Sequence, residues 1–211
     1  MFPEIVRDDV FRIESRRLWL RWPVAADAFD ADTPVATGLQ AAPLTAGCRM
    51  PGTACIVAWR AEAERGEALH LVIEEKADGR PAVGTVHLAW TRDGSLAIDY
   101  HLAPHRRGEG LMTEAIQAVI HTAFLLKLAP AITAAPLAAD RKGRDVLERC
   151  GFTYLGSGMR PGPGTPGLTA CDHFRLDRRT WLSLQGWGRP GHGPTSRLGA
   201  APTGFGLAAH V

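Results

Sequence analysis

Apolar and polar residues alternate along the first half of the chain with the two-residue period of β-strands. Leu18 and Leu20 alternate with Trp19 and arginines, and Pro23 ends the run. Three later segments are joined by turns that contain Asp-Gly, which is typical of β-hairpins. The predicted strands are Phe11–Trp22, Ala68–Glu75, Ala82–Trp90 and Ser95–Leu102, with helical segments expected from Val24 and over Thr53–Glu64. The three consecutive strands predict an antiparallel meander.

After residue 110 the apolar residues recur every three or four positions, which predicts an amphipathic helix over Leu111–Leu128. The elements expected after it are a strand over Ala131–Pro136, a helix over Lys142–Cys150, and strands over Thr153–Met159 and Thr169–Leu176. The predicted fold class is therefore α+β, a mixed sheet in which an antiparallel meander carries one strand-helix-strand crossover. Ligands bind such sheets beyond the strand that precedes the crossover helix, here at Leu102–Gly110.

Composition divides the 211 residues into one domain and a tail. Apolar residues make up 45% and charged residues 22%, as in soluble globular proteins. The expected domain is 1–185, because ten of the 26 residues in 186–211 are Gly or Pro and none is acidic. Such a tail buries too little apolar surface to offset its ordering entropy. Residues 157–168 are also rich in Gly and Pro, and we expect a long irregular loop there.

Charge and cysteine content exclude several classes of protein. The 24 basic and 22 acidic residues leave a net charge of +2, too small for general nucleic-acid binding. Cys48, Cys55, Cys150 and Cys171 lie far apart, which favours reduced thiols. The charged N-terminus is unlike a secretory signal, and the most apolar stretch contains Lys127 and two prolines, so no membrane association is expected. We expect a cytoplasmic protein, either a monomer or a homodimer.

The loop before the crossover helix holds the candidate chemistry. It reads Leu102-Ala103-Pro104-His105-Arg106-Arg107-Gly108-Glu109-Gly110-Leu111-Met112. The first amides of a helix have no partner within it, and glycines let the backbone approach an anion that a Cβ would hold off. Arg106 and Arg107 add positive charge. Thr113 replaces the third glycine of a dinucleotide fingerprint, so the motif alone fits either an anion site or a flexible turn.

Four blocks of sequence point to a family. They are Ile13–Arg21 (IESRRLWLR), Ala97–Ala115 (AIDYHLAPHRRGEGLMTEA), Val146–Phe152 (VLERCGF) and Phe174–Arg178 with Trp181. In this order they resemble E-T-E-R-L-x-L-R, G-Y-W-L-A-P…R-G-x-G…T-E-A, V-L-E-K-L-G-F and Y-x-L-x-R…W of the GNAT superfamily of N-acetyltransferases. The match is best with its ribosomal-protein-acetylating, RimJ/RimL-like branch. The resemblance runs from about Phe11 to Leu184.

The resemblance implies an N-acetyltransferase that uses acetyl-CoA as co-substrate. It implies a GNAT-like fold in which the strand before the loop splays from the next parallel strand. The pantetheine arm would fill this wedge, between Tyr100–Leu102 and Ile132–Ala134, and the pyrophosphate would lie on the amides of residues 107–112. The expected cofactor-binding residues are Tyr100, Leu102, Arg106, Arg107, Gly108, Glu109, Gly110, Leu111, Met112 and Asp140.

Five positions depart from the family pattern. His105 stands in place of Gln or Arg, Asp140 and Gly143 in place of the Asn and Ser before the second helix, and Asp99 in place of a glycine. Leu147 replaces a tyrosine that many members use as an acid. These departures keep open a different class, a degenerate non-catalytic module that binds acyl-CoA or a partner.

Acetyl transfer needs a base for the amine, an oxyanion donor and an acid for the leaving thiolate. A backbone amide near Leu102 would be the oxyanion donor. Asp99 and His101 share one strand face, so the carboxylate could raise the pKa of the imidazole, and His101 is the candidate base. The alternative is that His101 only fills the place of a tryptophan. Tyr154 is the candidate acid, or it packs in the sheet. His101 and His105 have an H-x3-H spacing without further ligands, so no metal is expected.

The ionisation of the acceptor amine indicates which kind of amine receives the acetyl group. An α-amine with a pKa near about 8 is partly neutral already, whereas a lysine amine costs about 4.6 kcal/mol to deprotonate at neutral pH. A weak base therefore suits a protein or peptide N-terminal α-amine, which is the first expectation. A small amine such as a polyamine, an amino acid or an antibiotic is the alternative.

Overall fold

The computed structural model describes residues 11–24, 27, 53–76, 82–161 and 167–187. Five of the eight described strands come before the long helix α2. In order, the helices and strands are β1 (Arg12–Glu14), β2 (Leu18–Arg21), α1 (Thr53–Glu64), β3 (Ala68–Glu75), β4 (Gly84–Trp90), β5 (Leu96–Leu102), the 3-10 turn η2 (Pro104–Arg106), α2 (Leu111–Leu125), β6 (Ala131–Ala134), α3 (Arg141–Arg149), β7 (Thr153–Pro161), β8 (Leu168–Asp177) and α4 (Arg178–Trp187).

The strands form one mixed sheet in the order β1-β2-β3-β4-β5-β6-β8-β7. Neighbours from β1 to β5 are antiparallel, β5 and β6 are parallel, and β8 is antiparallel to both β6 and β7. The parallel pair requires a crossover, which α2 supplies. The expected mixed sheet with one strand-helix-strand crossover is confirmed.

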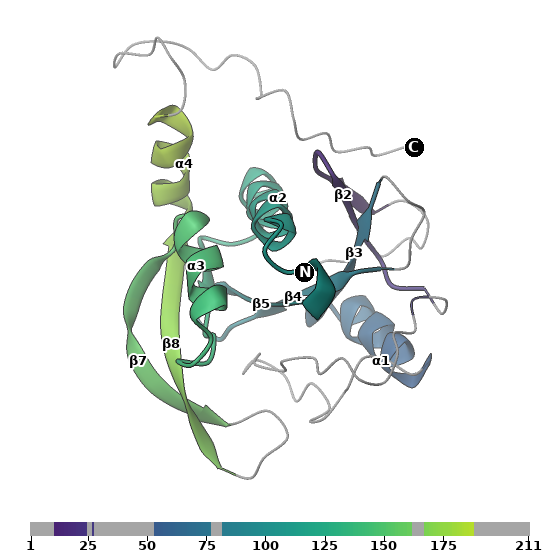
Figure 1. The fold of residues 1–211 in the computed structure, drawn as a ribbon, viewed down its shortest axis with the longest axis horizontal. Helices are drawn as coiled ribbons and strands as arrows, with labels where there is room; N and C mark the ends of the chain where they lie inside the picture. Colours follow the sequence, from purple (N-terminus) through teal and green to yellow (C-terminus); the bar gives the residue numbers. More distant parts are fainter. Residues whose placement is uncertain (1–10, 25–26, 28–52, 77–81, 162–166, 188–211) are drawn as a thin grey trace.

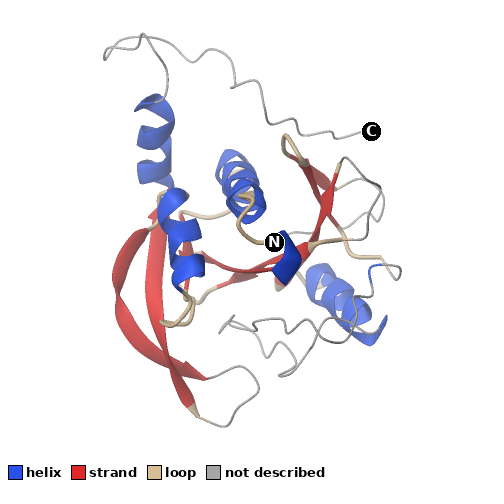
Figure 2. Ribbon diagram, in the orientation of Figure 1, coloured by secondary structure: helices blue, strands red, loops and turns tan. Residues whose placement is uncertain are grey.

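Helices α1 and α2 cover opposite faces of the sheet (Figures 1 and 2). Side chains on one face of β3, β4 and β5, such as Leu71, Val86 and Ile98, join the large core beneath α2. The other face carries Thr85 and His87 between small alanines, and α1 packs on β3 there. Within the described residues no helix is long and apolar enough to cross a membrane.

Three differences from the sequence predictions change the structure assigned to a segment, beyond shifts of a few residues at other boundaries. Phe11–Trp22 is a hairpin rather than one strand, because Ser15 turns the chain: its amide donates to the Leu18 carbonyl and its hydroxyl accepts from the Leu18 amide. Residues 157–161 belong to β7 and pair with β8 as far as Leu168, so the irregular loop is shorter than expected. Helix α4 was not predicted and reaches Trp187, two residues into the expected tail.

Some expectations concern residues outside the described part of the chain. These are most of the helix expected from Val24, residues 162–166 of the loop, and 188–211 of the tail. Cys48 also lies outside the described residues. The two cysteines whose side chains are described, Cys150 and Cys171, are buried free thiols.

Candidate functional site

The loop between β5 and α2 turns sharply at two glycines. Gly108 has φ +91° and Gly110 has φ +75°, backbone angles that favour glycine. Gly110 is the N-cap of α2, and no side chain caps the helix. A Cβ on Gly108 would meet no atom within 4 Å, so the space above this loop is open.

The amides of this loop and of the first turn of α2 differ in whether the described residues supply them with an acceptor. The Arg107 amide donates to the Pro104 carbonyl at 3.3 Å, and the Glu114 amide donates to the Gly110 carbonyl at 3.1 Å. Among the described residues, no acceptor meets the amides of Gly108–Met112. Together with the positive end of the α2 dipole, five such amides could hold an anion, and we call residues 108–112 the amide cradle. Of the amides of residues 107–112 that the sequence analysis expected to meet the pyrophosphate, that of Arg107 has an acceptor within the protein.

A gap opens between β5 and β6 beside the cradle. The two strands pair only at Leu96 with Ile132 and Ala97 with Thr133, although β5 continues to Leu102. The expected splay is therefore present. Its far side starts at Ala134, because Ile132 and Thr133 lie in the paired part.

The Leu102 amide of β5 is on the side of the strand that faces the gap. The Ala103 amide, just after β5, donates at 2.9 Å to the carbonyl of Val83, the residue before β4. In an antiparallel pair successive amides point to opposite sides, so the Leu102 amide faces away from β4. Arg107 Nε donates to the Leu102 carbonyl at 3.0 Å and holds this part of the strand edge.

The two arginines of the motif have different surroundings. Arg106 is bound by Glu75 at the end of β3, with Nε donating to Oε1 at 2.8 Å, and Glu109 lies 3.4 Å from its Nη2. The charge of Arg106 is thus largely compensated within the protein. Arg107 is exposed, and within the part of the chain that the structure describes its guanidinium donates through Nε, which leaves its charge beside the cradle.

Glu114 was not singled out by the sequence analysis, although it lies in the T-E-A block. Its carboxylate accepts from the Ser15 hydroxyl at 2.6 Å and from the amide and Nε of Arg17, each at 2.7 Å. Burial raises the pKa of Glu114, but these hydrogen bonds outweigh it and hold the pKa below its usual value. The β1–β2 turn is thereby fixed to the first turn of α2.

The start of α3 forms the wall beyond the gap. Asp140 caps the helix and accepts from the Gly143 amide at 2.9 Å. A Cβ at position 143 would overlap the Asp140 carboxylate, so the two departures from the family pattern fit each other. Tyr100 on β5 donates to the Gly143 carbonyl at 2.9 Å, and Leu147 is buried in the core.

The structure places Asp99 and His101 of β5 on the sheet face that also carries Thr85 and His87 of β4, as strand alternation predicts. The expected effect of Asp99 on His101 is wrong. Burial and then the nearby Arg107 lower the pKa of His101, and the Asp99 carboxylate accepts instead from the Tyr100 amide at 3.0 Å. His101 Nε2 is buried and meets no hydrogen-bond partner among the described residues. A neutral imidazole with an unmatched nitrogen is suited to accept a proton.

Tyr154 does not lie near His101 or Asp99. It lies on the edge strand β7, and its hydroxyl is 2.8 Å from the Ser157 hydroxyl. Its ring packs against Phe174 and beneath Arg144 of α3, on the opposite face of the sheet from His101. His105 is exposed in η2.

The mixed sheet, the splayed parallel pair and the open amide cradle define a GNAT-type acetyltransferase. Residues 17–153 match the family model of the acetyltransferase (GNAT) domain. The chain belongs to the GNAT acetyltransferase family, and no curated protein matches it.

Solved structures share the fold at low sequence identity. RimJ of Mycobacterium smegmatis, in complex with CoA-disulfide, has a TM-score of 0.61 at 19% identity and covers 85% of this chain and 96% of its own. The ribosomal-protein-S5-alanine acetyltransferase of Vibrio fischeri has a TM-score of 0.59 at 19% identity, and the match covers 81% of this chain and 98% of the Vibrio protein. The microcin C7 self-immunity acetyltransferase MccE, in complex with acetyl-CoA and AMP, has a TM-score of 0.62 at 16% identity. The match covers 77% of this chain and 93% of MccE. The branch that the sequence resembles is thus represented among the structural neighbours.

Proposed function

We propose that the protein transfers an acetyl group directly from acetyl-CoA to an amine, and that its acceptor is a protein or peptide N-terminal α-amine. The observation that carries the proposal is the row of five open amides beside an open strand edge. RimJ, a protein similar in fold, was solved with CoA-disulfide, and the similar Vibrio fischeri protein acts on ribosomal protein S5. A cytoplasmic location belongs to the same proposal, since protein N-termini of this kind arise there.

The cradle and the gap fit the two ends of the co-substrate. The amides of Gly108–Met112 would bind the pyrophosphate, with the Arg107 charge beside them. The edge of β5 near Leu102 and the start of α3 near Asp140 would line the pantetheine arm. Acetyl-CoA supplies the acetyl group as an activated thioester.

The acceptor would approach from the α1 face. Asp99 attracts an ammonium group, and neutral His101 takes its proton, so that the nitrogen attacks as a free amine. The Leu102 amide, which faces away from β4, would stabilise negative charge on the acyl oxygen. We assign no role as a general acid to Tyr154, because its side chain lies on the face of the sheet opposite His101.

Thermal unfolding with acetyl-CoA tests the binding step. At one hundred times its dissociation constant, a ligand of the folded state adds about 2.7 kcal/mol of stability. No stabilisation would overturn acetyl-CoA as co-substrate. Thiol release is then followed with a peptide α-amine, a peptide whose only free amine is lysine, and a polyamine. Preference for the α-amine supports the proposal, whereas preference for the polyamine identifies a small-molecule enzyme.

A further inference from the structure

A chain of four buried polar side chains crosses the sheet beneath α1. Glu62 Oε2 of α1 lies 2.7 Å from His70 Nε2 of β3, and His70 Nδ1 lies 2.7 Å from His87 Nδ1 of β4. His87 Nε2 lies 3.0 Å from the Thr85 hydroxyl. Trp59 covers the two imidazoles, stacking on His70 at 4.9 Å between ring centroids. Three hydrogen bonds thus link four residues without a break.

The chemistry of these atoms fixes the direction of each hydrogen bond. An ionised carboxylate only accepts, so His70 carries its proton on Nε2. Burial lowers the pKa of both histidines, which are therefore neutral, and His70 Nδ1 must accept from His87 Nδ1. His87 Nε2 then accepts from the Thr85 hydroxyl. Every donor in the chain points toward Glu62.

The cluster is not arranged for a metal ion. Metal–imidazole bonds are about 2.0–2.1 Å long, so two nitrogens only 2.7 Å apart leave no room for an ion between them. Within the described residues no group of His, Cys, Asp and Glu side chains could hold a metal. A hydrogen-bonded chain is the remaining use of this geometry.

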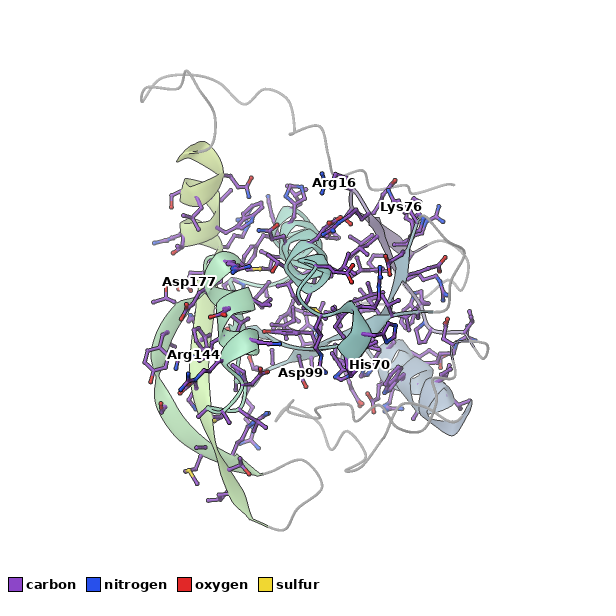
Figure 3. The ribbon with its side chains drawn as sticks, viewed as in Figure 1. Arg16, His70, Lys76, Asp99, Arg144 and Asp177 are labelled. Carbon is purple, nitrogen blue, oxygen red and sulfur yellow. The ribbon has the colours of Figure 1, made fainter. Side chains whose placement is uncertain are left out.

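The Thr85 end of the chain adjoins the candidate base. Thr85 and His101 are directly opposite in the β4–β5 register, on the face that α1 covers. Asp99 is opposite His87 in the same register, so His70, His87 and Asp99 form the next row. In Figure 3 the labelled side chains of His70 and Asp99 lie on the α1 side of these strands. Thr85 and His101 are thus neighbours across the strand pair, and His101 Nε2 has no hydrogen-bond partner among the described residues.

We propose that Thr85, His87, His70 and Glu62 form a proton relay that carries the acceptor amine's proton from His101 to the surface beneath α1. The inference rests on the proposed amine acetylation. The ammonium gives one proton to His101, which passes one to the Thr85 oxygen. Thr85 gives its hydroxyl proton to His87 Nε2, His87 gives its Nδ1 proton to His70, and His70 gives its Nε2 proton to Glu62. The amine loses one proton and Glu62 gains one.

The outlet of the relay is Glu62. The Glu62 side chain is 11% exposed, whereas His70 is fully enclosed, so only the carboxylate end can exchange protons with solvent. Thr85, His87 and His70 each receive one proton and give one away. Each therefore ends with the same number of protons, and each histidine ends with its proton on the other nitrogen. Such a shift avoids forming a charged histidine in a site where burial disfavours it.

Thr85→Val and Thr85→Ser make the sharpest test. T85V keeps the side-chain shape and removes the hydroxyl, whereas T85S keeps the hydroxyl. We expect T85V to lower kcat about 10-fold or more, T85S to recover most of that loss, and the KM for acetyl-CoA to stay unchanged. E62Q, which can still accept from His70 but has no charge to take up a proton, should behave as T85V. H121Q removes a histidine that packs on Trp181, outside the relay, and should leave kcat unchanged.

The outcomes separate the relay from the proposed function. If T85V and E62Q turn over as fast as T85S, the relay is wrong while acetylation stands. If the wild-type protein binds acetyl-CoA and releases no thiol with any amine, both proposals fail. Nitrogen NMR adds a readout without turnover: His87 should carry its proton on Nδ1 and His70 on Nε2. The opposite tautomers would overturn the direction of the relay.

Discussion

Arg17 and Glu114 are joined by two hydrogen bonds of 2.7 Å, from the amide and from Nε of Arg17 to the two carboxylate oxygens of Glu114. Arg17 Nη1 also donates to the Glu109 carbonyl at 3.1 Å. The β1–β2 turn therefore holds both the first turn of α2 and the loop before it. Two of the sequence blocks that resemble the family meet at this contact, and the cradle depends on it for its position.

Glu114→Gln should destabilise the protein and weaken acetyl-CoA binding. Loss of a charged acceptor in a half-buried site costs about 1–2 kcal/mol of unfolding free energy. The pKa of Glu114 is lowered in the folded state, so its contribution is present above the unfolded value of about 4.3 and is lost as the pH falls through the folded value. Urea unfolding should show the largest difference from wild type at neutral pH and a smaller one below about pH 4.

Glu148→Gln is the matched control for that experiment. Glu148 pairs with Arg144 at 3.9 Å, and its side chain is 54% exposed, so the pair contributes little. We expect no measurable change in unfolding free energy. An equal loss in both variants would show that the Glu114 contact has no special part in the fold.

Gly108→Ala should weaken acetyl-CoA binding without a clash inside the protein. Its φ of +91° makes alanine unfavourable by about 1–2 kcal/mol, and no protein atom lies within 4 Å of the new Cβ. The Cβ would instead enter the space where we place the pyrophosphate. We expect the dissociation constant of acetyl-CoA, measured by calorimetry, to rise at least about 10-fold.

Gly94→Ala controls for the backbone cost. Gly94 has φ +76°, likewise meets nothing within 4 Å, and lies in the β4–β5 turn at the other end of β5. The two variants should lose similar stability, but only Gly108→Ala should lose affinity. Equal affinities would place the anion elsewhere than above Gly108.

His101→Gln should lower kcat about 100-fold if His101 is the base, since general-base catalysis contributes at least that much. Burial and Arg107 lower the pKa of His101, and a base acts only in its unprotonated form. The acid limb of the wild-type rate should therefore lie below the ordinary histidine pKa of about 6.5, and the variant should lack it. Protonation of the acceptor amine also lowers the rate as the pH falls. An acceptor amine with a low pKa moves that effect to lower pH, so that the limb due to His101 can be measured separately. An unchanged rate would remove His101 from the mechanism.

The sequence predicts what depends on local pattern and misses what depends on contacts between distant segments. The β3 strand Ala68–Glu75 and the α1 helix Thr53–Glu64 have the predicted bounds, because period and turn residues determine them locally. The pairing of Arg106 with Glu75 joins residues on different elements, so the motif alone presented Arg106 as a free charge.

The candidate site shows the same division. Strand alternation correctly places Asp99 and His101 on one face, but the sign of the His101 pKa shift depends on burial and on the place of Arg107, which no local pattern gives. The chain from Glu62 to Thr85 requires the β3–β4 register, which pairs His70 with His87. A register shifted by one residue would put these imidazoles on opposite faces.

Asp140 and Gly143 should behave as one structural unit at the start of α3. Asp140→Ala removes the N-cap and should cost about 1 kcal/mol of unfolding free energy, whereas Asp140→Asn keeps an acceptor and should cost only a few tenths. Gly143→Ala should destabilise the wild-type background, because its Cβ overlaps the Asp140 carboxylate, but not the Asp140→Ala background. A double-mutant cycle measured by urea unfolding shows this coupling, and additive effects would mean that the two departures are independent.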